Sequence, residues 1–149
     1  MTKYVFDTNV TSIIGRDEQV AYNLLDRLSN LADEDTMFVS VLTLYESSYG
    51  LKNATCDLHK QEIEKNIAFV QKYFEIIPLD LKEMDIYAEL KVAYKNHTGI
   101  TKNSAKKNDI DILIASSAIA KNATLISNDR IFETLSEIEP RLQYENWLK

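Results

Sequence analysis

Short apolar segments alternate with helical patterns along this sequence, and this alternation restricts the fold more than any other feature. The apolar segments are rich in aromatic and β-branched side chains, which favour strands. They are residues 4–6, 37–39, 75–79 and 123–126. Between them, apolar residues recur at helical spacing, as in the stretch from Val20 to Leu31. Strands that alternate with helices pair in parallel, so we expect an α/β protein with helices on both faces of a mostly parallel sheet.

The remaining elements can be placed from the same patterns. Helices are predicted at residues 10–14, from 17 or 18 onward, and at 42–51, 58–74, 81–95 and 108–120, with an amphipathic turn around 131–135. The polar residues 96–107 are predicted to be a loop, and residues 142–147 an edge strand. A chain of 149 residues without repeats fits one domain over residues 1–149.

Composition excludes several classes of protein. A hydrophobic content of 45% and a charged content of 27% are typical of a globular chain rather than a disordered one. No apolar run is long enough to cross a membrane, and no secretion signal precedes the first strand. Cys56 is the only cysteine, which excludes an internal disulfide and a metal cluster built on sulfur. We therefore expect a cytoplasmic protein.

The formal net charge of −6 argues against nucleic-acid binding, because phosphates are held by lysine and arginine. This argument weakens if the carboxylates gather around a cation, since a bound ion reverses the local charge. Lys102, Lys106 and Lys107 could then form an RNA-binding track. A solvated loop explains the same three lysines equally well.

Four acidic residues occupy positions that a parallel sheet brings together. Asp7 follows the first strand, and Glu46 lies in the helix after the second. Asp111 lies in the first turn of the helix before the fourth strand, and Asp129 follows that strand. In open parallel sheets, ligands bind at the carboxyl ends of the strands. The four side chains are therefore candidates for one site.

Each acid also has a purely structural explanation. Asp7 could cap the turn of helix that follows it, and Glu46 could lie on a solvated helix face. Asn108 followed by Asp111 resembles a capping box, in which side chains bind the first amides of a helix. Asp129 could belong to an ordinary Asn-Asp turn.

The acids are more informative together than singly. Two charges about 4 Å apart repel by roughly 4 kcal/mol at an effective dielectric near 20, so such a group binds protons or a cation. Oxygen ligands alone favour Mg²⁺ or Mn²⁺, which can activate a water and neutralise charge on a phosphate. His59 and His97 are expected at the surface. The pattern therefore suits metal-assisted hydrolysis of a phosphodiester.

Four motifs occur in order along the chain. They are Val5-Phe6-Asp7-Thr8-Asn9, Ser40-x-x-Thr43-x-x-Glu46-x-x-x-Gly50, Asp111-Ile112-Leu113-Ile114-Ala115-x-x-Ala118 and Ala123-Thr124-Leu125-Ile126-Ser127-Asn128-Asp129-x-x-Phe132, followed by Asn146-Trp147. Together they resemble the PIN-domain ribonucleases, and among these the VapC-type toxins of toxin–antitoxin pairs. The resemblance covers essentially the whole chain.

This resemblance implies a three-layer α/β/α sandwich and cleavage of RNA by a metal-activated water. It implies a Mg²⁺ or Mn²⁺ site in which Asp7 and Asp111 are the main ligands, completed by Glu46 and Asp129. It also implies a small antitoxin protein as partner, whose tail covers the acidic groove, and a homodimer.

The resemblance also suggests supporting roles around the four acids. Thr8 and Ser127 would orient carboxylates by hydrogen bonds, and Asn9 is a further candidate. Asp109 is a departure from the pattern, because it adds a second carboxylate beside Asp111. The spacing to Ile114 and Ala115 favours Asp111 as the ligand and Asp109 as the cap of the helix.

Other functions fit parts of the pattern. A DNA nuclease or an RNA-processing enzyme of the same superfamily would share the fold and the acids. Phosphoryl transfer through Asp7 is disfavoured, because such enzymes have a second aspartate two residues on, where this chain has Asn9. A binding module without catalysis would keep the acidic pocket alone.

Overall fold

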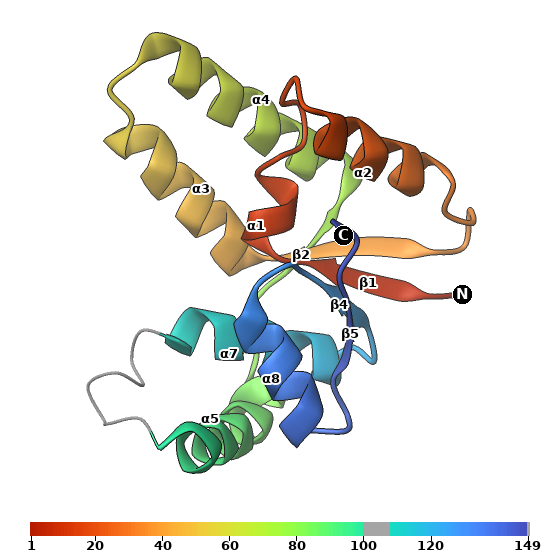
Figure 1. The fold of residues 1–149 in the computed structure, drawn as a ribbon, viewed down its shortest axis with the longest axis vertical. Helices are drawn as coiled ribbons and strands as arrows, with labels where there is room; N and C mark the ends of the chain where they lie inside the picture. The colour runs from red at the N-terminus through yellow and green to blue at the C-terminus, as the bar shows by residue number, and fades with distance from the viewer. Residues whose placement is uncertain (100–107, 149) are drawn as a thin grey trace.

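A computed structural model describes residues 1–99 and 108–148, which form a five-stranded sheet flanked by helices (Figure 1). The strand order is β3-β2-β1-β4-β5, and every neighbouring pair is parallel. The strands are β1 (Lys3–Phe6), β2 (Thr36–Ser40), β3 (Glu75–Ile77), β4 (Thr124–Ile126) and β5 (Gln143–Glu145). The predicted parallel sheet is confirmed, and β5 is the predicted edge strand.

Helices cover both faces of the sheet, which confirms the three-layer sandwich (Figure 1). They are α1 (Thr8–Thr11), α2 (Gln19–Ser29), α3 (Val41–Asn53), α4 (Asp57–Tyr73), the 3₁₀ helix η1 (Leu81–Glu83), α5 (Met84–Thr98), α7 (Asp109–Ala120) and α8 (Arg130–Ile138). Within the described ranges, no helix is both long and apolar enough to span a membrane.

The sheet separates two apolar cores. Because alternate strand residues point to opposite faces, Val5 packs against α5, α7 and α8, whereas Phe6 packs against α1, α2 and α4. The Phe6 ring centroid lies 5.3 Å from that of Phe74 and 5.4 Å from that of Trp147, both edge-on. The guanidinium of Arg27 lies over the ring of Trp147, 4.2 Å from its centroid. These contacts fix the carboxyl end of β1 from one side.

Helix α7 is buried along most of its length, and small side chains allow its close approach. Ala115, Ser116, Ser117 and Ala118 are all buried. The two serine hydroxyls donate to carbonyls one turn earlier in the helix, at 2.7 and 3.1 Å. Burial of these hydroxyls therefore leaves no donor unsatisfied, and the helix that carries Asp111 is held firmly in place.

Some predicted boundaries were wrong. Helix α5 continues to Thr98, so residues 96–98 are helical rather than loop, and it ends where Gly99 adopts a left-handed φ of 66°. The first turn of the predicted helix 81–95 is the separate helix η1, capped by Asp80. The predicted turn near residue 131 is the full helix α8. Lys102, Lys106 and Lys107 lie outside the described residues.

The strand order leaves a crevice at the carboxyl ends of β1 and β4. β1 lies at the centre, with β2 on one side and β4 on the other, so the winding of the chain reverses between β1 and β4. At such a reversal, the connections leave the two strand ends in opposite directions and a crevice remains. The residues that follow β1 and β4 are Asp7 and Ser127.

Candidate active site

Asp7 is buried at the carboxyl end of β1. Its side chain is only 3% exposed, and its Oδ2 accepts a 3.0 Å hydrogen bond from the hydroxyl of Ser127. Its backbone N–H donates to the carbonyl of Ile126 at 3.0 Å, which extends the pairing of β1 with β4. Asp7 occupies the N-cap position of α1 without a side-chain capping bond. Capping therefore does not account for this buried acid.

Burial raises the pKa of Asp7 to about 6. The hydrogen bond from Ser127 and the backbone amide of Thr8 lower this pKa, and the negative charge of Glu46 raises it. The net rise means that the surroundings of Asp7 do not offset the loss of hydration of its charge.

Glu46 is positioned by two threonines. The hydroxyl of Thr8 donates to Oε1 of Glu46 at 2.7 Å and also lies in a 3.2 Å hydrogen bond with the hydroxyl of Thr43. Thr43 is buried inside α3, whereas Ser40 is the N-cap and accepts from the amide of Leu42 at 3.1 Å. The sequence analysis names Thr43 as part of a motif but predicts no contact for it. Its three-residue spacing from Glu46 places both on one helix face and could have identified it.

Asp129 is tied to three neighbours. Its Oδ1 accepts from the amide of Ile131 at 3.2 Å and so caps α8, while its Oδ2 accepts from the side-chain amide of Asn9 at 3.4 Å. Its own backbone N–H donates to the hydroxyl of Ser127 at 3.0 Å. Ser127 therefore links Asp129 to Asp7 through a single oxygen atom.

Asp111 is half-buried in the first turn of α7, and its pKa is raised to about 7. Burial is the largest cause, followed by the negative charges of Asp7, Asp129 and Glu46. Because charge interactions weaken with distance, this coupling indicates that all four acids share one neighbourhood. The assignment of all four acids to one site stays a prediction.

Asp109 has a different role from the predicted one. Asn108, not Asp109, is the N-cap of α7, and it makes no side-chain capping bond, so no capping box forms. Oδ1 of Asp109 lies 2.8 Å from Nζ of Lys91 and 3.0 Å from the hydroxyl of Tyr87, both on α5. Asp109 therefore fastens the start of α7 to α5.

The four acids carry negative charge that nearby cations do not balance. No ion pair among the described residues involves Asp7, Glu46, Asp111 or Asp129. Within residues 1–99 and 108–148, no three acidic, histidine or cysteine side chains already stand close enough to hold a metal ion. Oxygen-only donors with unbalanced charge fit a hard divalent cation in chemistry. Ligation would require at least one carboxylate to rotate toward the others.

A cavity of about 560 Å³ adjoins this acidic cluster between α3, α4 and the segment after α1. Thr8 and Glu46 line one end of it, and apolar side chains such as Ile63 and Phe69 line much of the rest. The buried Asn66 fixes its wall, because the side-chain amide donates to the carbonyls of Thr11 at 2.5 Å and Ile14 at 3.3 Å. The acidic cluster therefore opens onto a largely apolar hollow.

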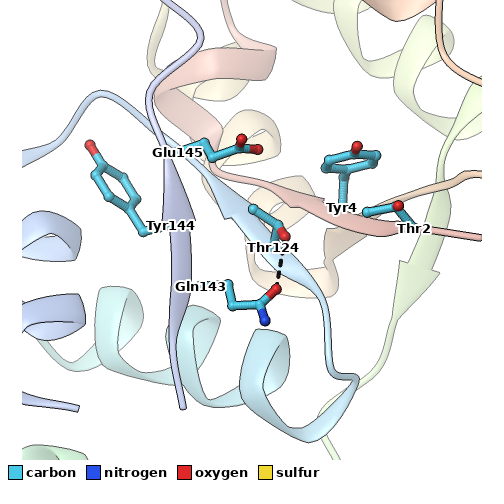
Figure 2. A pocket seen from close by; sticks show the side chains of 6 residues that line it. All are labelled: Thr2, Tyr4, Thr124, Gln143, Tyr144 and Glu145. Atoms are coloured by element: carbon cyan, nitrogen blue, oxygen red, sulfur yellow. Dashed lines mark hydrogen bonds between the residues drawn. The ribbon is translucent and has the colours of Figure 1, made fainter. Parts of the chain in front are cut away.

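A second hollow lies on the sheet around β4 and β5 and contains none of the four acids (Figure 2). Its volume is about 280 Å³, and it is lined by Thr2, Tyr4, Thr124, Gln143, Tyr144 and Glu145. Tyr4, Thr124 and Gln143 are register partners across three strands, and the threonine hydroxyl lies 3.2 Å from the glutamine carbonyl. Thr124 and Gln143 begin their strands and Tyr4 is the second residue of β1, so this row lies away from the sheet edge that carries Asp7.

The fold and the acidic cluster together define an α/β protein with a carboxylate-lined site where the strand order reverses. The chain belongs to the PIN domain family, whose model matches residues 4–138. Ribonuclease VapC2 of Rickettsia felis is 31% identical over 148 residues, which is 98% of this chain and 98% of that protein.

Solved structures agree on the fold. The crystal structure of VapBC2 from Rickettsia felis, bound to a DNA fragment from their promoter, contains a chain with a TM-score of 0.72 and 28% identity, covering 98% of this chain and 99% of that one. VapBC-1 from nontypeable Haemophilus influenzae gives a TM-score of 0.72 at 20% identity, covering 99% of this chain and 100% of that one.

Proposed function

We propose that this chain is an endoribonuclease and the toxin of a toxin–antitoxin pair. The observation that carries the proposal is the hydrogen-bond network at the strand-order reversal, in which Ser127 joins Asp7 to Asp129 and Thr8 holds Glu46. Membership of the PIN domain family and the ribonuclease name of the Rickettsia felis relative support the same activity.

The proposed cofactor is Mg²⁺ or Mn²⁺. Asp7 and Asp111 would be its main ligands, with Glu46 and Asp129 completing the site or holding waters. When bound, the ion supplies positive charge against the phosphate and activates water for hydrolysis. The raised pKa values of Asp7 and Asp111 support this assignment, because a cation would stabilise both carboxylates in their charged form.

The chain's own residues hold these acids in place. Ser127 donates to Asp7 and accepts from the amide of Asp129, so one hydroxyl sets the relative positions of two proposed ligands. Thr8 holds Glu46 at 2.7 Å, and Asn9 contacts Asp129 at 3.4 Å. Such fixed side chains reduce the reorganisation that ligand and substrate binding would otherwise require.

The proposed partners are RNA as substrate, a small antitoxin protein and a second copy of the chain. The similar chain from Rickettsia felis belongs to a VapBC assembly, which supports an antitoxin partner. The homodimer and the role of Lys102, Lys106 and Lys107 in RNA binding stay predictions.

The test is RNA cleavage by the purified chain with and without a divalent ion. We expect cleavage with Mg²⁺ or Mn²⁺, none in excess chelator, and none for Asp7→Asn. Chelated protein that still cleaves RNA efficiently would contradict the metal-dependent mechanism. Digestion of RNA and DNA side by side separates the ribonuclease from a DNA nuclease of the same fold.

A binding module without catalysis is the remaining alternative. Titration calorimetry with Mg²⁺ and Mn²⁺ addresses it, because a nuclease site must bind the ion. A folded chain that binds neither ion and cleaves neither nucleic acid would favour the binding module.

A further inference from the structure

Helix α3 exposes two tyrosines next to Glu46. Tyr45 is 65% exposed and Tyr49 is 71% exposed, and among the described residues neither ring has an aromatic partner and neither hydroxyl has a hydrogen bond. Other exposed tyrosines of the chain have partners: the hydroxyl of Tyr22 donates to Asp17 at 2.7 Å, and the ring of Tyr73 lies 4.7 Å from that of Phe69. The contacts that stabilise the fold therefore do not account for the pair on α3.

The two tyrosines continue the face of α3 that holds Glu46. Residues 42, 45, 46 and 49 are spaced by three and four along the helix, so their side chains are neighbours on one face. Leu42 is buried in the same core as α7, which sets this face toward the side of the sheet where Asp111 lies. Figure 1 shows α3 projecting beyond the sheet, with the first turn of α7 on the same side of the molecule.

We propose that Tyr45 and Tyr49 form a stacking platform for unpaired bases of single-stranded RNA beside the phosphate that is cleaved. The inference rests on the proposed ribonuclease function and adds the residues that position its substrate. Unpaired bases stack on aromatic side chains, and this recognition tolerates any sequence because every base has a π-face. A paired base keeps its faces inside the duplex, so the platform selects single strands.

Charge explains why such a platform is needed here. The chain carries 23 acidic and 17 basic residues, and the acidic cluster itself repels phosphates. Arg16 and Lys65 line the cavity beside Glu46 and can attract phosphates, but the four acids of the cluster outnumber them. Stacking on uncharged rings supplies affinity that does not depend on charge. The platform should accordingly affect substrate binding more than the chemical step, and its contribution should vary little with salt.

The first experiment measures KM and kcat separately for a single-stranded RNA substrate. In the double variant Tyr45→Ala/Tyr49→Ala, we expect KM to rise by about tenfold or more, with kcat changed by less than about twofold. Tyr45→Phe/Tyr49→Phe keeps both rings and should restore the wild-type KM. Tyr73→Ala is the matched control, because this exposed tyrosine lies at the end of α4, where the chain enters β3 and not where β1 ends.

The second experiment measures binding without cleavage. In an Asp7→Asn background, fluorescence anisotropy of a labelled RNA gives the Kd for single-stranded and duplex forms. We expect the alanine pair to weaken single-strand binding by about tenfold or more at both low and high salt, and to change duplex binding little.

The outcomes separate this inference from the proposed function. If wild-type protein binds single-stranded RNA through the tyrosines but never cleaves it, the ribonuclease proposal fails and the platform stands. If wild-type protein cleaves RNA and the alanine pair leaves KM and Kd unchanged, the platform is overturned. A variant that changes only the oligomeric state in size-exclusion chromatography would assign the tyrosines to a protein interface and also overturn it.

Discussion

The hydroxyl of Ser127 lies 3.0 Å from Oδ2 of Asp7 and 3.0 Å from the backbone nitrogen of Asp129, so one oxygen joins two acids that are 122 residues apart in sequence. Ser127 is fully buried, and water cannot replace it without a local rearrangement. This bridge adds a side-chain link to the backbone pairing of β1 with β4 at the candidate site.

We predict that Ser127→Ala destabilises the chain by about 1–3 kcal/mol, because the amide of Asp129 and the carboxylate of Asp7 each lose a partner. Ser116→Ala is the control, since that equally buried hydroxyl bonds only to its own helix at Ile112 and its loss should cost about 1 kcal/mol or less. Urea unfolding measures both. Equal losses for the two variants would show that the bridge has no special role.

The raised pKa values predict how stability depends on pH without metal. The folded chain holds protons on Asp7 and Asp111 up to about pH 6 and 7, whereas the unfolded chain releases them near 3.8. The folded state therefore binds more protons between these values, and its stability falls as pH rises through that range. We expect a lower Tm in chelator at about pH 8 than at about pH 5.5.

Addition of Mg²⁺ at the higher pH should raise this Tm, because the ion binds the folded state only. The double variant Asp7→Asn/Asp111→Asn serves as control, and it should lose both the steeper pH slope and the response to Mg²⁺. Scanning calorimetry with and without chelator makes the comparison. A wild-type slope identical to that of the double variant would contradict the pKa assignments.

Substitutions of Asp109 and Asp111 should have different effects on RNA cleavage. Asp111→Asn is expected to abolish RNA cleavage, whereas Asp109→Asn is expected to weaken the contact with Lys91 and Tyr87 and to leave cleavage intact. That contact is about one-third exposed, so its loss should cost about 0.5–1 kcal/mol. Cleavage assays and thermal melting on both variants test this. Loss of activity in Asp109→Asn with normal metal binding in Asp111→Asn would reverse the assignment.

Asn66 is predicted to stabilise the wall of the cavity beside Glu46. Its side-chain amide donates to the carbonyl of Thr11, at the end of α1, and to that of Ile14, and Asn66→Ala leaves both without this donor. We expect a loss of about 1–3 kcal/mol in urea unfolding. Asn30→Ala is the matched control, because its amide bonds at the exposed end of α2 and its removal should cost about 0.5 kcal/mol. A loss no greater than that of Asn30→Ala would contradict the prediction.

Most of the fold could be predicted from local patterns. The strand-like segments are short, apolar and separated by helical spacing, so the parallel sheet follows from alternation alone. The strand order does not, because it depends on which faces of the helices pack together. The end of α5 was also misplaced, since residues 96–98 are polar and only the left-handed Gly99 marks where the helix stops.

The positions of the acidic residues at the candidate site could be predicted from sequence. Most of the residues that contact them or line the adjoining cavity could not. Asp7 and Asp129 follow strands, and that position is visible in sequence. The partner of Asp109 is not, because Lys91 lies on a different helix and no spacing rule connects them. Asn66 was missed for the same reason, since its acceptors lie more than 50 residues earlier in the chain.

The central place of β1 also bears on how the chain emerges from the ribosome. β1 is made first, yet its neighbour β4 and the residues that contact Asp7 and Asn9 lie beyond residue 123. A nascent chain halted before that point lacks Asp129 and the Ser127 hydroxyl that joins Asp129 to Asp7. The acidic site can therefore assemble only after β4 has been made, late in the synthesis of the chain.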